Sequence, residues 1–199
     1  MTEMMRLGSL LRLARDTIAN PREGAETVLS FAPPRQALAL MFALVVVLSI
    51  LIGEVVLLVS PPTDEGPLTG ASPMAMGAVQ AMFLYLMIHA IHIVGRFFGG
   101  TGAFEEAALL VIWLQAIFLL VQVIQLFAVA LVPPLLGTIT IVALVLFVWL
   151  LVNFIAVLHG FTSLGMVFVM TVMGGFTILF FLSLTLTLLG LVPDPGAAP

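Results

Sequence analysis

The sequence predicts an all-α polytopic membrane protein: a bundle of five transmembrane helices preceded by a short amphipathic N-terminal segment. Hydrophobic residues make up 62% of the 199-residue chain and charged residues only 8%. A soluble domain has about 45–50% apolar and about 25% charged residues. The apolar tract over residues 36–192 has room for roughly five crossings, since each needs about 20 apolar residues. This composition excludes a soluble enzyme, a nucleic-acid-binding domain and a disordered chain.

The N-terminal segment covers residues 1–35 and is expected at the cytoplasmic membrane surface. Residues 4–18 place apolar side chains on one side of a helix and charged side chains on the other, a pattern typical of a helix lying flat on a membrane. The apolar positions are Leu7, Leu10, Leu11, Ala14 and Ile18, and the charged ones are Arg12, Arg15 and Asp16. A second helix is predicted to begin at Pro21 with Asn20 as its N-cap.

The five transmembrane helices are predicted from the long apolar runs that follow. We place them at about 36–58, 74–95, 104–131, 135–158 and 164–191. The first of these, at about 1.5 Å per residue, covers about 34 Å, which exceeds a hydrocarbon core of about 30 Å. A Pro- and Gly-rich connection at 60–73 and a short tail at 193–199 are expected on the external side.

The arginines predict the topology. Five of the six precede the first transmembrane helix, and Arg96 follows the second. Five crossings put both places on the same side, so the positive-inside rule predicts a cytoplasmic N-terminus and an external C-terminus. The chain contains no cysteine, which excludes disulfides, thiolate metal sites and cysteine nucleophiles.

Ionisable and amide side chains within the helices are the candidate site residues, because polar groups are costly in lipid and normally face the bundle interior. In the second helix Tyr85, His89, His92 and Arg96 follow one another at spacings of 4, 3 and 4 residues, so their side chains form one stripe along the helix. Together with residues of the third and fourth helices they form a candidate polar seam. The seam consists of Tyr85, His89, His92, Arg96, Gln115, Gln122, Gln125, Asn153 and His159.

The polar seam has several interpretations. A functional interpretation is a proton path, a slot for lipid headgroups or a metal site built on His89 and His92. A structural interpretation is that these side chains form hydrogen bonds between packed helices, each of which stabilises the bundle by about 0.6–2 kcal/mol. Zinc requires three or four ligands, and the helix that carries the two histidines offers no carboxylate beside them. We therefore expect no metal and no cofactor.

The turn between the second and third helices is a candidate cytoplasmic site containing Gly99, Gly100, Glu105 and Glu106. Arg96 is expected either to pair with the two glutamates or to hold a lipid phosphate, whose geometry suits a guanidinium. The glycines are not followed by Lys-Ser/Thr and no strand precedes them, so no nucleotide site is expected. A Gly-x-x-x-Gly spacing that ends at Gly99 would instead permit close helix packing.

Three segments resemble the Yip-domain family of Ypt/Rab-interacting polytopic membrane proteins, in its bacterial branch. They are NPREGAETVL, GRFFGGTGAFEEAALLVIWLQ and LVNFIAVLHGFTSLG, within a resemblance that covers roughly residues 10–190. The resemblance implies five membrane helices and a cytoplasmic N-terminus. Eukaryotic relatives are linked to Rab-type GTPases, membrane curvature and vesicle traffic, but this sequence lacks their Asp-Leu-x-Gly-Pro motif. We therefore expect no Rab-like GTPase partner and transfer no catalytic residue.

The leading functional hypothesis is a non-enzymatic integral inner-membrane protein that organises or scaffolds membrane lipids and protein partners. The alternative is a lipid- or small-solute-moving protein, scramblase- or transporter-like, that uses the polar seam. A metal-dependent membrane enzyme is the third class. The expected partners are the lipid bilayer, other membrane proteins or a second copy of the chain, with no nucleic acid and no nucleotide.

Overall fold

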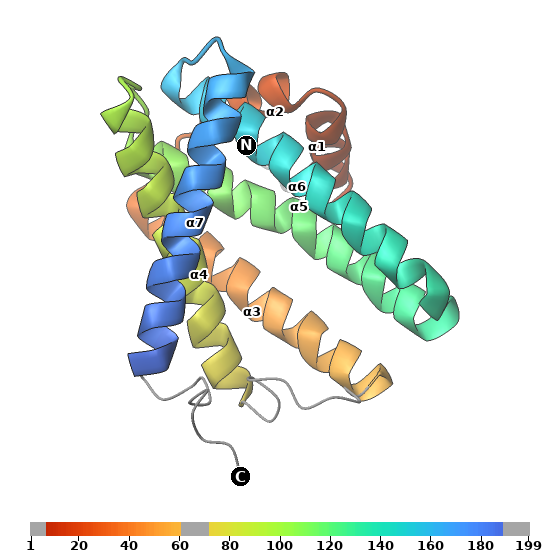
Figure 1. Cartoon of the computed structure of the whole chain (residues 1–199). Coiled ribbons are helices and arrows are strands. Elements are labelled where there is room, and N and C mark those ends of the chain that lie inside the picture. The colour runs from red at the N-terminus through yellow and green to blue at the C-terminus, as the bar shows by residue number, and fades with distance from the viewer. Residues whose placement is uncertain (1–6, 61–71, 189–199) are drawn as a thin grey trace.

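The computed structural model describes residues 7–60 and 72–188, and every regular element in these ranges is a helix (Figure 1). Two short helices, α1 (Leu7–Ala19) and α2 (Pro21–Leu29), come first. The long helices are α3 (Arg35–Val59), α4 (Pro73–Phe97), α5 (Phe104–Leu131), α6 (Leu136–His159) and α7 (Leu164–Leu188), with a 3-10 helix, η1 (Pro133–Leu135), before α6. All five long helices of the described chain are apolar and long enough to cross a membrane. The predicted fold class is confirmed.

The ends of the long helices lie close to the predicted ones. α5 has the predicted bounds, and the other helix ends that the structure describes differ from prediction by at most two residues. The last residues of the span predicted at 164–191 lie outside the described residues. Most of the connection at 60–73 and the whole tail at 193–199 also lie outside them.

Local sequence explains where several helices begin and end. The Ser72 hydroxyl accepts a hydrogen bond from the Ala75 N–H at 3.2 Å, which satisfies a free donor at the start of α4. α6 ends at Gly160, which has a left-handed φ of 71° that favours glycine. α2 begins at Pro21 with Asn20 at its N-cap position, as predicted, although the Asn20 side chain makes no capping hydrogen bond.

The long helices form two groups. α3 packs along α5 and α5 pairs with α6, while α4 packs against α7. In Figure 1 the α5–α6 hairpin and α3 slant away from α4 and α7, and the groups meet where α4 contacts α5 and α6 contacts α7. The bundle is therefore splayed: its helices converge at one end and diverge toward the other.

The core lies at the convergent end. Buried apolar side chains concentrate in the first half of α5 and the second half of α6, where residues 107–112 and 150–156 are all buried. Elsewhere large apolar side chains point outward, as Leu58 and Leu131 do. Because lipid tails solvate such side chains, this surface suits a protein surrounded by a bilayer.

Helices α1 and α2 form a hairpin that covers α5 and α6 at this convergent end. Gly24 of α2 lies so close to α1 that an added Cβ would be 2.5 Å from the Thr17 hydroxyl. The Trp113 indole N–H of α5 donates a hydrogen bond to the same hydroxyl at 3.3 Å. The predicted apolar stripe is therefore divided, since Ala14 is buried against the protein whereas Leu10, Leu11 and Ile18 are exposed.

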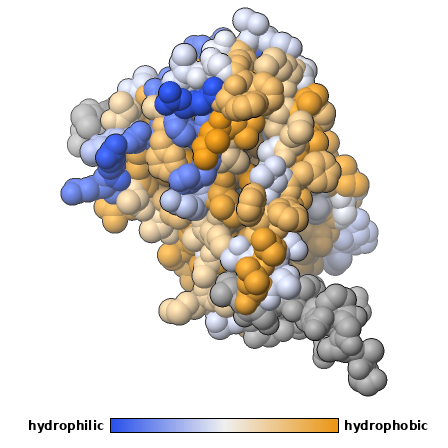
Figure 2. Space-filling model, turned by 60° about the vertical axis from the view of Figure 1, so that its left-hand side comes forward, coloured by the Kyte–Doolittle hydropathy of each residue, from blue (hydrophilic) through white to orange (hydrophobic). Residues whose placement is uncertain are grey.

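The convergent end also carries most of the charge. It holds α1, α2, the α4–α5 turn at 98–103 and the α6–α7 turn at 160–163, and we call it the α1–α2 end. Every arginine of the described residues lies on α1 or α2, at the first residue of α3 or in the last turn of α4, next to these elements. Hydrophilic residues accordingly gather in the upper part of Figure 2, while the surface below them is mostly apolar.

Candidate functional site at the charged end of the bundle

A buried histidine joins three elements at the α1–α2 end. His159, the last residue of α6, is 3% exposed. Its Nδ1 accepts a hydrogen bond from the Gly102 N–H at 3.2 Å, and its Nε2 lies 3.1 Å from the carbonyl oxygen of Ile91. An acceptor at Nδ1 places the proton of a neutral ring on Nε2, which then donates to Ile91. His159 thus links α6 to α4 and to the α4–α5 turn.

Glycines in the last turn of α4 and in the α4–α5 turn make room for this histidine. A Cβ added to Gly95 or Gly100 would overlap the imidazole ring of His159, and one added to Gly102 would lie 2.6 Å from the Leu158 side chain. Gly99 has a φ of +87°, which favours glycine for conformational reasons. The glycines therefore form the surface against which His159 and Leu158 pack.

The glutamates of the turn have partners other than the predicted one. Arg35, the first residue of α3, pairs with Glu105, with Arg35 Nη2 2.6 Å and Nε 2.8 Å from Glu105 Oε1. Glu106 accepts a hydrogen bond from the Ala103 N–H at 2.8 Å and so caps α5. Arg96 is exposed and forms no ion pair within the described residues. The predicted pairing of Arg96 with the glutamates is wrong, because α3 brings Arg35 to Glu105 instead.

The two histidines of α4 pack on one phenylalanine of α5. The ring of His89 lies 4.2 Å from that of Tyr85 and 4.8 Å from that of Phe104, and the His92 ring meets Phe104 at 6.0 Å. The His89 Nδ1 hydrogen-bonds the carbonyl oxygen of Tyr85 at 3.0 Å. His92 Nδ1 is buried without a hydrogen-bond partner. No group of three or more His, Asp or Glu residues in the described ranges could hold a metal.

The amides of the predicted seam face different neighbours. The Gln115 amide donates to the Ser49 hydroxyl of α3 at 2.8 Å, and the Gln125 amide to the Thr140 hydroxyl of α6 at 3.4 Å. Asn153, 3% exposed, donates to the carbonyl oxygen of Trp149 one turn earlier in α6. The remaining amide, at position 122 of α5, is half-buried.

The structure thus gathers only part of the seam. Tyr85, His89, His92 and His159 lie at the α1–α2 end around the start of α5. The glutamine at 115 instead faces α3, and the one at 125 lies far along α5. Sequence reasoning did not identify Arg35 as a site residue, because its partner lies 70 residues away and no local motif marks the pair.

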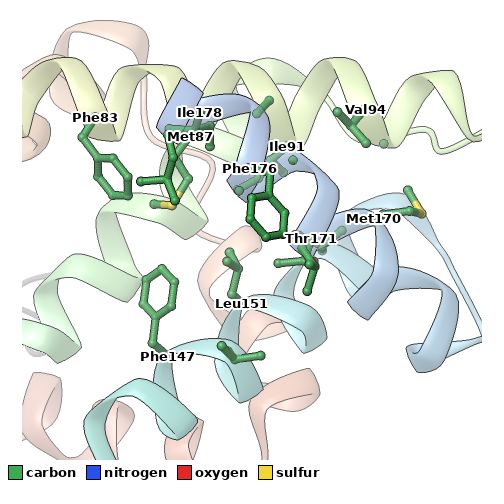
Figure 3. A pocket seen from close by; sticks show the side chains of 18 of the residues that line it. Phe83, Met87, Ile91, Val94, Phe147, Leu151, Met170, Thr171, Phe176 and Ile178 are labelled. Carbon is green, nitrogen blue, oxygen red and sulfur yellow. The ribbon is translucent and has the colours of Figure 1, made fainter. Parts of the chain in front are cut away.

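Two cavities adjoin the cluster formed by Tyr85, His89, His92 and His159. One of about 380 Å³ lies between α4, α6 and α7 and is lined by apolar side chains that include Met87, Phe147 and Phe176 (Figure 3). The hydroxyl of Thr171 lines it too but donates to the Val167 carbonyl oxygen at 2.8 Å. The other cavity, of about 590 Å³, lies between α3, α4 and α5 and has the Arg35–Glu105 pair in its wall.

Comparison with known proteins places this architecture in a family. The family model described as the Yip1 domain matches residues 15–187, from α1 to the last turn of α7. Neither a curated protein nor a solved structure matches the chain. The match covers most of the chain and includes all the helices that carry the cluster around His159. The chain therefore belongs to the Yip1-domain family and is a multi-pass integral membrane protein.

Proposed function

We propose that this protein is a non-enzymatic component of a bacterial inner membrane that organises lipids and protein partners. The observation that carries this proposal is the α1–α2 hairpin, which is fastened to the bundle and yet exposes Leu10, Leu11 and Ile18. Exposed Arg12 and Arg15 lie on the same short helix. Apolar and cationic side chains together bind a surface of lipid tails and phosphates.

The attachment of the hairpin supports an organising role. Gly24 allows α2 to approach Thr17 closely, and Trp113 holds the Thr17 hydroxyl from α5. An amphipathic helix fastened in this way inserts into the leaflet at a fixed place relative to the bundle. It therefore orders the lipids around the protein, and the same apolar face suits a second copy or another membrane protein.

The charge distribution supports an orientation with the α1–α2 end in the cytoplasm. All the described arginines lie at that end, and cytoplasmic segments carry an excess of basic residues. The C-terminus then lies in the periplasm. The proposed partners are lipids and membrane proteins, without nucleic acid, nucleotide or a Rab-like GTPase.

Depth measurements on the reconstituted full chain test this proposal. The chain contains no native cysteine, so a fluorophore can be attached at Leu10→Cys or Ile18→Cys, with Thr27→Cys on the exposed side of α2 as control. We expect lipid-borne quenchers to act on residues 10 and 18 and aqueous quenchers to act on residue 27. Aqueous quenching at all three positions would remove the basis of the proposal.

A second candidate function is movement of lipid or of a small solute. It is favoured by the cavity between α4, α6 and α7, which adjoins α4 although no residue of the predicted seam lines it. Its walls are apolar, so they suit an acyl chain better than a polar solute. The test is lipid flipping in vesicles by the wild type and by a His92→Ala, Arg96→Ala variant, with Arg22→Ala as control. Flipping that the double variant alone abolishes would establish this function, and its absence from the wild type would rule it out.

A further inference from the structure

The cavity between α3, α4 and α5 combines a charged rim with apolar walls. Arg35 and Glu105 stand in its wall at the first turns of α3 and α5. Deeper along the same helices it is lined by Leu38, Phe42 and Ile112. Such a gradient from charge to hydrocarbon over a few helical turns matches the gradient from a lipid headgroup to its acyl chains.

We propose that this cavity binds one phospholipid whose headgroup is zwitterionic and ends in a primary ammonium. The phosphate lies on the Arg35 guanidinium, the ammonium lies on the Glu105 carboxylate, and an acyl chain fills the apolar part. This inference does not rest on the proposed function, which concerns α1 and α2, so either can fail alone.

Binding of the headgroup requires Arg35 and Glu105 to exchange each other for the phosphate and the ammonium, and the exposure of both side chains supports this exchange. The Arg35 side chain is 87% exposed and that of Glu105 is 38% exposed. An exposed ion pair contributes only about 0–1 kcal/mol, so little is lost when it opens. Phosphate accepts two hydrogen bonds from a guanidinium, and an ammonium offers three N–H donors to a carboxylate.

The carboxylate determines the class of headgroup. Glu105 repels an anionic headgroup that has no ammonium of its own, because both carry negative charge at the rim. A quaternary ammonium has no N–H to donate, and it is bound by open aromatic faces instead. The rings of Tyr85 and Phe104, which also line the cavity, are already in contact with His89.

Native mass spectrometry of the purified full chain tests this inference with three dioleoyl lipids at equal concentration. Phosphatidylethanolamine is expected to bind about tenfold better than phosphatidylcholine and phosphatidylglycerol, because a charge-assisted hydrogen bond distinguishes it. Glu105→Gln removes that preference, and Arg35→Gln weakens the binding of all three lipids. Arg22→Gln and Glu26→Gln on α2, outside the cavity, leave the wild-type pattern.

Two further measurements address the acyl chain. Ala39 lines the cavity and is exposed, so Ala39→Trp is expected to block lipid binding without disturbing the core. Ala43→Trp, at an exposed position one turn further along α3 that does not line the cavity, is the control. Glycerophosphoethanolamine, which has the headgroup without acyl chains, is expected not to compete. Equal binding of the three lipids, or a preference for another headgroup, would overturn the inference. So would a preference for phosphatidylethanolamine that persists in Glu105→Gln or in Ala39→Trp.

Discussion

The imidazole of His159 occupies the space that a side chain on Gly95 would need. The two residues lie 64 positions apart and belong to α6 and α4. Because the glycine has no Cβ, the histidine reaches the carbonyl oxygen of Ile91 behind it and the N–H of Gly102 beside it. The Gly-rich turn and the His-Gly at the end of α6 are thus two halves of one packing arrangement.

Gly95→Ala is therefore expected to destabilise the protein. The added methyl group overlaps the His159 ring, and such overpacking costs about 1–3 kcal/mol. Gly53→Ala on α3, where a Cβ meets nothing within 4 Å, is the matched control and is expected to be neutral or slightly stabilising. The measurement is the unfolding transition of the detergent-solubilised protein.

A double variant separates this collision from a general effect of alanine in α4. In Gly95→Ala, His159→Ala the methyl group enters space that the ring has left. The loss of stability is then smaller than the sum of the two single losses, as is usual for residues in contact. Additive losses would show that His159 does not occupy the space beside Gly95.

The hydrogen bond between Gln115 and Ser49 is expected to hold α3 against α5. Interhelical hydrogen bonds of this kind contribute about 0.6–2 kcal/mol in membranes. Ser49→Ala, Gln115→Leu and their combination form a double-mutant cycle, read by the same unfolding assay. A coupling energy near zero would mean that the 2.8 Å contact contributes nothing to the packing of α3.

Gly24→Ala is expected to loosen the α1–α2 hairpin while leaving the membrane helices folded. Its Cβ would lie 2.7 Å from the Thr17 backbone, which cannot turn aside as a flexible side chain would. The readout is the rate at which trypsin cleaves after Arg15 and Arg22, which should rise several-fold if the contact costs about 1 kcal/mol or more. Gly8→Ala in open space should leave the rate unchanged, and an unchanged rate in Gly24→Ala would contradict the contact.

The proposed topology predicts which introduced cysteines an impermeant thiol reagent reaches in whole cells. The native chain has none, so each variant reports one position. Ser72→Cys and Thr138→Cys are expected to react from outside. Both positions lie near the helix ends that are farther from α1. Ser30→Cys and Ser163→Cys are expected to react only after the membrane is opened. The reverse pattern would place the N-terminus outside.

The sequence was sufficient to predict the long helices because each is a long apolar run that is bounded by Pro, Gly or charged residues. The bounds of α5 followed from the charged Glu105 and Glu106 at one end and from Pro133 at the other. The topology argument used only where arginines stand relative to these runs. Such features are local, and local patterns are what a single sequence displays.

The contacts between distant segments were not predictable in the same way. Arg35 and Glu105 lie 70 residues apart, and Trp113 and Thr17 lie 96 apart. Helical periodicity places a side chain on a face of its own helix but does not say which helix covers that face. Gln115 illustrates this limit, because its spacing predicts a place in a seam with the second helix, whereas its side chain faces Ser49 on the first.

The slant of the α5–α6 hairpin relative to α4 and α7 has a consequence for the surrounding bilayer. α5 has 28 residues and is therefore about 42 Å long, so it matches a hydrocarbon layer of about 30 Å only when strongly tilted. α4 and α7, with 25 residues each, are about 37 Å long and run at a different inclination. The two groups of helices therefore need different tilts to match the same hydrocarbon layer, so the bundle is expected to fit one bilayer thickness best.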